Sequence, residues 1–227
     1  KSSNTLFNDL IKIHVYDGKK EQDLKKTIKV NVIKDEISQK VRKQYEENPY
    51  PRWRFIFRNT KKNFLVRLQN QIKPNVIDIK SSEKFNNPNV LVAGCGTGRH
   101  ISIVDSYENA NILAVDLSLS SLAYARRKAE ENNLKNVSFL QSDILDLRNI
   151  KKKFDIIESV GVIHHMKDPL KGLEVFALKD NDDILESLAE RISGRISLHD
   201  VYHPDTEEIL VASNEMISES ISKIIDD

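Results

Sequence analysis

A short apolar run followed by a glycine-rich turn constrains this chain more than any other feature. Val90 to Ala93 lead directly into Gly94, Gly96 and Gly98, in the pattern G-C-G-T-G. A buried strand that ends in glycines at this spacing is typical of a strand-to-helix turn where the backbone approaches a ligand, because glycine has no Cβ to obstruct the approach. The alternative is a tight turn that binds nothing.

Further apolar runs follow at the spacing expected of an alternating strand and helix pattern. They are Ile112 to Val115, Val137 to Leu140 and Phe154 to Glu158. A helix is predicted over Leu119 to Asn132, with Ser118 or Ser120 as its cap. Strands that alternate with helices indicate a parallel sheet with crossover helices, and runs without strict polar alternation indicate strands covered on both faces. The predicted fold class is therefore α/β.

Two acidic residues stand at the ends of these predicted strands. Asp116 ends the second strand and Asp143 follows the third. The carboxyl ends of parallel strands border the ligand crevice of such sheets, so Asp116 is placed to accept the hydroxyls of an adenosine ribose, and Asp143 an adenine amino group. The alternatives are that Asp116 caps the next helix and that Asp143 only makes a turn.

Taken together, these motifs resemble those of the class I S-adenosylmethionine-dependent methyltransferases. The matching stretches are V-A-G-C-G-T-G, A-V-D-L-S, Q-S-D-I-L and F-D-I-I-E-S-V-G-V-I-H-H-M-K-D-P. The resemblance implies a Rossmann-like fold and S-adenosylmethionine as cofactor, with S-adenosylhomocysteine as product. It implies these cofactor-binding residues: Gly94, Cys95, Gly96, Thr97, Gly98, Asp116, Leu117, Asp143, Ile144 and Val160.

The loop around His164 and His165 resembles the loop after the fourth strand in small-molecule methyltransferases, and it lacks an N-P-P-Y motif. Either histidine is a candidate catalytic residue, because an imidazole titrates near neutrality and can take a proton from an acceptor. A packing or loop-capping role is the alternative for each. The predicted acceptor is a small molecule.

Upstream of the glycines, a helix is predicted over Lys34 to Glu47 and a second over Phe57 to Ile79. Between them lies Y-E-E-N-P-Y-P-R-W, which resembles a segment found just before the methyltransferase core in bacterial proteins. Tyr45, Tyr50 and Trp53 in this segment are predicted to cover the cofactor and border the acceptor pocket, as a rigid lid. The alternative is a hydrophobic staple that packs the N-terminal helices on the sheet.

The last quarter of the chain resembles part of the β′ subunit of bacterial RNA polymerase, without its magnesium loop or zinc cluster. Three regions are therefore predicted: a helical lid region over 1–85, a cofactor-binding core over 86–171 and an atypical tail over 172–227. The parallel sheet is expected to be truncated after its fourth strand, and a chimeric reading frame or a divergent native end would explain the tail.

This truncation predicts an exposed edge on the strand Phe154 to Glu158. Unpaired strands invite pairing. We therefore expect either that Arg195 to Leu198 or Glu208 to Ala212 pairs with this edge, or that two chains associate there as a homodimer. A helix is predicted over Ile184 to Ile192.

Composition narrows the function classes further. The chain carries 35 basic and 34 acidic side chains, a formal net charge of +1, which gives no electrostatic reason to expect nucleic acid or a membrane surface as partner. One cysteine and scattered histidines predict no metal site and suit a cytoplasmic protein. A nicotinamide-dependent oxidoreductase is disfavoured, because the glycines read G-C-G-T-G and not G-x-G-x-x-G. A non-catalytic binding module is the third alternative.

Overall fold

The structure is a computed structural model that describes residues 4–56, 60–71, 85–176, 178–180, 183–186, 189, 192–197, 200–203, 206 and 208–226. The chain forms two compact units, Lys1–Pro169 and Leu170–Asp227. Each unit is described by itself.

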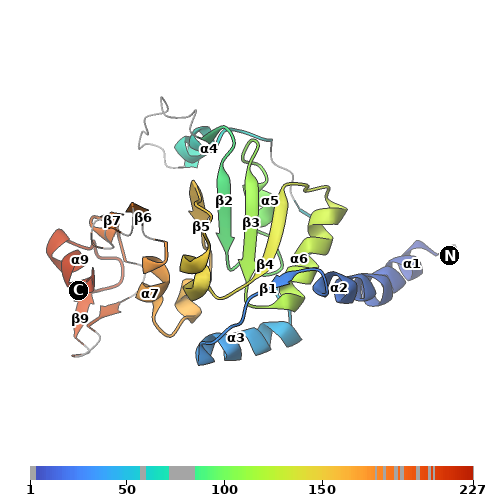
Figure 1. The fold of residues 1–227 in the computed structure, drawn as a ribbon, viewed down its shortest axis with the longest axis horizontal. Helices are drawn as coiled ribbons and strands as arrows, with labels where there is room; N and C mark the ends of the chain where they lie inside the picture. The colour runs from blue at the N-terminus through green and yellow to red at the C-terminus, as the bar shows by residue number, and fades with distance from the viewer. Residues whose placement is uncertain are drawn as a thin grey trace. The chain divides into compact units, whose positions relative to one another are not determined.

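The first unit is built on a five-stranded sheet in the order β1-β4-β3-β2-β5 (Figure 1). Every neighbouring pair in this sheet is parallel. The strands are β1 (Lys29–Val30), β2 (Asn89–Ala93), β3 (Asn111–Asp116), β4 (Val137–Gln141) and β5 (Ile156–Glu158). The predicted α/β fold with a parallel sheet is confirmed, and the four strands expected from the sequence are all present.

Strand β1 was not predicted, and it adds a fifth strand beside β4. Lys29 pairs with Leu140 and Val30 with Gln141, and the amide of Asn31 continues the ladder by donating to the Gln141 carbonyl. Two paired residues are too few to give a periodic apolar pattern, so only the tertiary pairing reveals this strand.

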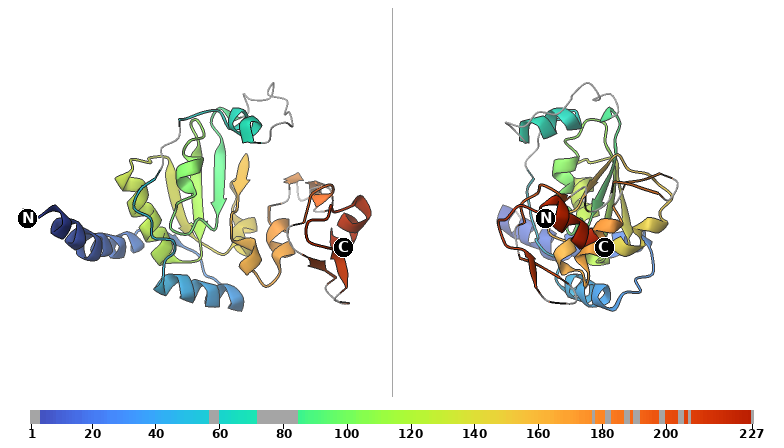
Figure 2. Two further views of the ribbon diagram at one scale, coloured as in Figure 1. Left: turned by 180° about the vertical axis from the view of Figure 1, so that it is seen from behind. Right: turned by 90° about the vertical axis from the view of Figure 1, so that its left-hand side faces the viewer.

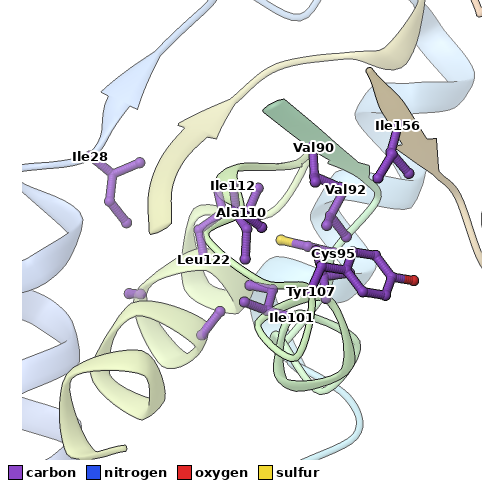
Figure 3. Close-up of a cluster of buried hydrophobic side chains, with 14 residues drawn as sticks. Ile28, Val90, Val92, Cys95, Ile101, Tyr107, Ala110, Ile112, Leu122 and Ile156 are labelled. Carbon is purple, nitrogen blue, oxygen red and sulfur yellow. The ribbon is translucent and has the colours of Figure 1, made fainter. Parts of the chain in front are cut away.

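Helices α5 (Ile101–Val104) and α6 (Leu119–Glu131) pack their apolar side chains on the sheet. Figure 3 shows Ile101 and Leu122 gathered with Val90, Val92 and Ile112 in one buried cluster. The amide of Ser121 donates to the Ser118 hydroxyl at 3.0 Å, so Ser118 caps α6, one of the two candidates predicted.

The N-terminal region supplies further helices. They are α1 (Thr5–Ile11), the π-helical η1 (Lys12–Tyr16), α2 (Asp17–Lys25), α3 (Glu36–Glu47) and α4 (Phe64–Gln71). Figures 1 and 2 show α2 alongside α6. Helix α3 confirms the helix expected over Lys34 to Glu47. Of the helix expected over Phe57 to Ile79, only α4 is described, because 57–59 and 72–79 lie outside the described residues.

The second unit contains two separate antiparallel pairs. Strand β6 (Leu178–Asp180) pairs with β7 (Asp183–Glu186), and β8 (Val201–Tyr202) pairs with β9 (Ile209–Val211). Helix α7 (Pro169–Glu174) begins at the boundary between the units, and α9 (Glu219–Asp226) ends the described chain. Val211, Ile217 and Ile225 form a small core.

One expectation for this tail is wrong. The helix predicted over Ile184 to Ile192 does not begin at Ile184, because Ile184 lies in β7 and pairs across the ladder with Lys179. Within the second unit, β9 pairs with β8, and Ile196 bridges Met216. Among the described residues of the first unit, β5 has β2 as its one ladder partner, and the pairing of its other side stays a prediction.

No helix among the described residues has both the length and the apolar character needed to cross a bilayer.

Candidate functional site

A cavity of about 500 Å³ opens where the strands of the first unit end. Its walls come from the carboxyl ends of β2, β3 and β4, the loop after β5, and α3. Among the predicted site residues, these line it: Tyr45, Tyr50, Gly94, Cys95, Gly96, Thr97, Asp116, Leu117, Asp143, Ile144, Val160 and His165. This is the crevice in which open α/β sheets bind ligands.

The glycine loop is folded against the neighbouring strand and leaves room at its centre. The amides of Gly94 and Cys95 both donate to the Val115 carbonyl, at 2.8 and 2.9 Å. A Cβ on Gly94 would lie 2.3 Å from a methyl of Val162, whereas a Cβ on Gly96 would meet only the Tyr50 carbonyl oxygen at 3.8 Å. The backbone is therefore open to a ligand at Gly96.

Gly98 has a different environment from the one predicted. It does not line the cavity, and a Cβ there would lie 2.7 Å from the Cβ of Ala125 on α6. With φ at +83°, Gly98 allows the loop to turn and the helix to approach closely. Its position indicates a packing role instead of contact with a cofactor.

Asp116 lines the cavity and also holds the backbone on either side of it. Its Oδ2 accepts the Gly96 amide at 2.8 Å and its Oδ1 accepts the Ser118 amide at 2.8 Å, so it holds both the loop and the start of α6. Each carboxylate oxygen accepts more than one hydrogen bond, so capacity remains for ligand hydroxyls. Burial raises the pKa of this carboxyl, and the two amides oppose that shift.

Asp143 lies one strand further along the same edge. It is 3% exposed, and its Oδ1 accepts the Leu145 amide at 3.0 Å at the start of the 3₁₀-helix η3 (Ile144–Asn149). Its carboxylate also lines the cavity, and carboxylate oxygens can accept a hydrogen bond from a ligand amino group.

The three aromatic residues of the predicted lid do not act alike. Tyr45 and Tyr50 line the cavity, but Trp53 does not. The Trp53 indole N–H donates to the Thr97 carbonyl at 3.0 Å, and its ring packs edge-on against Tyr124, with centroids 6.3 Å apart. Trp53 thus fits the staple alternative: it ties its segment to the glycine loop and to α6.

Glu46, which the sequence did not single out, holds α3 beside the cavity. It accepts hydrogen bonds from the Ser120 amide at 3.0 Å, the Ser118 hydroxyl at 3.1 Å and Lys25 Nζ at 3.1 Å. Burial alone would raise the pKa of Glu46, but the hydrogen bonds from Ser120 and Lys25 lower it. A charged carboxylate at the first turn of α6 also suits the helix dipole.

The two candidate catalytic histidines differ in their position relative to the cavity. His165 lines the cavity and meets Tyr45 edge-on, with ring centroids 6.4 Å apart. The His164 ring is tilted against the His165 ring, with centroids 4.0 Å apart, and lies outside the lining. Burial lowers the pKa of His165, and the neighbouring His164 lowers it further, so a neutral imidazole is favoured.

One hydrogen-bonded chain was missed at the end of β5. His100 lines the cavity, its Nε2 is hydrogen-bonded to Glu158, and the Tyr107 hydroxyl donates to the other oxygen of that carboxylate. Burial would raise the pKa of Glu158, but the bonds from His100 and Tyr107 lower it. The available signal was the position of Glu158, which is an acid at a strand end, as Asp116 is.

Comparison with known proteins now adds to this geometry. A family model described as a methyltransferase domain matches residues 84–225, which is more than half of the chain. The chain belongs to this methyltransferase family. The match extends past residue 171, the predicted end of the cofactor-binding core.

Other likenesses are partial. An uncharacterized Synechococcus protein is 34% identical over 98 residues, 42% of this chain and 24% of that protein. The RNA polymerase β′ subunit of Salinibacter ruber is 42% identical over 72 residues, 32% of this chain and 5% of that subunit. The solved structure of PKMT2 from Rickettsia typhi in complex with AdoHcy shares 26% identity over 56% of this chain and 24% of that one, with a TM-score of 0.41.

The cavity suits the cofactor of this methyltransferase family, S-adenosylmethionine. Its volume lies in the range of roughly 300 to 1,000 Å³ typical of small-molecule sites. The open backbone at Gly96 and the two wall carboxylates, Asp116 and Asp143, offer contacts to a nucleoside. The residues present therefore fit the group.

Proposed function

We propose that the first unit binds S-adenosylmethionine in this cavity and transfers its methyl group to a small-molecule acceptor. The observation that carries the proposal is that Gly96, Asp116 and Asp143, from the ends of three adjacent parallel strands, face one cavity. A chance arrangement of turn glycines and helix caps would not need to converge in this way.

In this proposal, each wall element holds one part of the cofactor. Asp143, after β4, accepts from the adenine amino group, and Asp116, at the end of β3, accepts from the ribose hydroxyls. The glycine loop after β2 lies against the methionine part. Cys95, Thr97, Leu117, Ile144 and Val160 complete the walls.

The protein's share of the reaction is alignment and the exclusion of water. Bound S-adenosylmethionine supplies an already activated methyl group, so no protein nucleophile is required. Tyr45 on α3, Tyr50 and His165 form the wall on the acceptor side. A neutral His165 suits a base that removes the proton an acceptor loses on methylation. Alignment in a dry pocket provides most of the rate in such a transfer.

Composition and domain organisation support proposals for the roles of the three regions, the acceptor class, the compartment and the oligomeric state. Residues 1–85 act as a lid region, 86–171 as the cofactor-binding core and 172–227 as an additional tail. A net charge of +1 supports a small-molecule acceptor over nucleic acid or a membrane surface. The single cysteine, Cys95, supports a cytoplasmic protein. Within the part of the chain that the structure describes, one side of β5 has no ladder partner, which supports a homodimer.

The experiment is a calorimetric titration of the full chain with S-adenosylhomocysteine, S-adenosylmethionine and NAD. We expect both adenosyl ligands to bind and NAD not to bind. Asp143→Asn should weaken S-adenosylhomocysteine by about tenfold, because the amide nitrogen would meet a donor where the carboxylate accepts.

A control variant, Asp146→Asn, makes the same chemical change outside the cavity lining and should bind as wild type does. Binding of NAD alone would favour the oxidoreductase, and binding of none of the three would refute the proposed function.

A further inference from the structure

The hydrogen-bonded group of His100, Glu158 and Tyr107 borders the cavity and has no role in the proposed function. Tyr107 is 5% exposed and packs edge-on against Phe64, with ring centroids 5.1 Å apart. Burial raises the pKa of the Tyr107 hydroxyl and the Glu158 charge raises it further, so Tyr107 remains a donor. Glu158 is therefore fixed from the core side and holds the His100 ring from there.

Glu158 lies at the end of β5, at the edge of the sheet where the cavity opens. Across the sheet edge the strands run β4, β3, β2, β5, so Asp143, Asp116, the glycine loop and Glu158 follow one another in that order. With the adenosine over β4 and β3, the other end of the cofactor lies toward β2 and β5. That end of S-adenosylmethionine carries a carboxylate.

The charges of the wall agree with this direction. Among the described lining residues, both acidic side chains, Asp116 and Asp143, belong to the adenosine end. The basic ones are Arg99 and His100, which directly follow the glycine loop, whereas His165 in the loop after β5 is favoured as a neutral imidazole. Of these, His100 has its ring held by a carboxylate, so it loses little conformational freedom when it binds an anion.

We propose that His100 binds the carboxylate of the amino-acid part of S-adenosylmethionine, with Glu158 and Tyr107 as positioning residues. The inference rests on the proposed function. The Nε2–H of His100 donates to Glu158, and a second proton on Nδ1 lets the same ring donate to the ligand carboxylate. Arg67, whose guanidinium lies 5.9 Å from the Tyr107 ring centroid, and Arg99, which lines the cavity beside His100, are charged groups on the same side.

The test compares two ligands that differ only in this carboxylate: S-adenosylhomocysteine and its decarboxylated analogue. Calorimetry on the wild-type chain should show about tenfold weaker binding of the analogue. His100→Asn should weaken S-adenosylhomocysteine by a similar factor but leave the analogue unchanged, so the two ligands become equal. Glu158→Gln should give the same pattern at smaller size, because the His100 ring keeps its place but loses its stabilising charge.

His14→Asn is the matched control, because it removes an exposed imidazole from η1, outside the cavity lining. It should bind both ligands as wild type does. Thermal unfolding of each variant without ligand shows whether it is folded, and His100→Gln replaces His100→Asn if the latter is not.

The result that overturns the inference is an unchanged ratio of the two affinities in His100→Asn or His100→Gln. If wild type binds both ligands equally, the carboxylate is not held at all, and the inference fails while the proposed function stands. If wild type binds neither ligand, the proposed function fails and this inference fails with it.

Discussion

Two glycines of one loop differ in what an added methyl group would meet. Both have positive φ, +51° at Gly96 and +83° at Gly98, so alanine at either costs on the order of 1 kcal/mol of backbone strain. At Gly98 the new Cβ would also lie 2.7 Å from Ala125 Cβ on a packed helix, which adds about 1 to 3 kcal/mol of overpacking.

We therefore expect Gly98→Ala to lower the free energy of unfolding by more than Gly96→Ala, measured by denaturant unfolding without ligand. Gly96→Ala should instead show its larger effect on S-adenosylhomocysteine affinity, because its Cβ points into open space beside the cavity. Equal stability losses in the two variants would contradict this reading of the loop.

For single residues, the sequence predicted those whose position follows from neighbouring residues in the sequence. It missed those whose contacts are with residues distant in the sequence. Asp116 and Asp143 could be found because strand ends can be read from adjacent apolar runs. The partner of His100, Glu158, lies 58 residues away, and nothing near His100 indicates the pairing. Trp53 was misplaced for the same reason, because its contacts are Thr97 and Tyr124.

Between elements, an ion-pair network joins α2 to α6. Arg127 is 3% exposed and contacts Glu21 at 2.9 Å and Glu131 at 2.7 Å, and Glu131 also meets Lys12 and Lys128 at 3.1 Å each. Burial alone would raise the pKa of Glu131, but these bonds lower it to about 2 from 4.5.

The consequence is a pH-dependent stability with a defined sign. A carboxyl whose folded pKa is depressed stabilises the protein above its unfolded pKa, and that contribution disappears as pH falls through the folded value. The difference in free energy of unfolding between wild type and Glu131→Gln should therefore be largest above pH 4.5 and should shrink toward pH 2. Urea unfolding across this range measures it, and a difference that does not change with pH would refute the assignment.

Elements with long or regular patterns were predicted well. Strands β2 to β4 and helices α3 and α6 each carry enough residues for the periodicity to be visible. Strand β1 could not be predicted, because two residues give no period. The stretch I-L-E-S-L-A-E fits helical spacing and therefore predicts a helix, but its first residues form β7, which pairs with β6. The secondary structure of such short segments depends on the strand that pairs with them, and the segment's own residues do not indicate that partner.

For the whole molecule, the proposed homodimer gives a direct test. Ile157 on β5 and Val66 on α4 are each 38% exposed. If two chains pair along β5, Ile157→Lys should shift the full chain from dimer to monomer in light scattering, because charge beside a strand edge disfavours pairing. Val66→Lys should leave the mass unchanged. A wild-type chain that stays monomeric at every concentration would exclude the dimer.

The family match and the partial likeness to RNA polymerase β′ subunits differ in extent. The methyltransferase match reaches residue 225, while the β′ likeness spans about a third of the chain. A chimeric reading frame stays a prediction, and sequencing of the transcript from its native cell would test it.

The strand β1 has a practical consequence for anyone who shortens this protein. A fragment cut to the boundaries of the family match, 84–225, would discard β1 together with α3 and Trp53. It would leave the backbone of β4 open to self-association, and the cavity would lose the wall that α3 provides. A usable expression fragment of the first unit should therefore begin before Lys29.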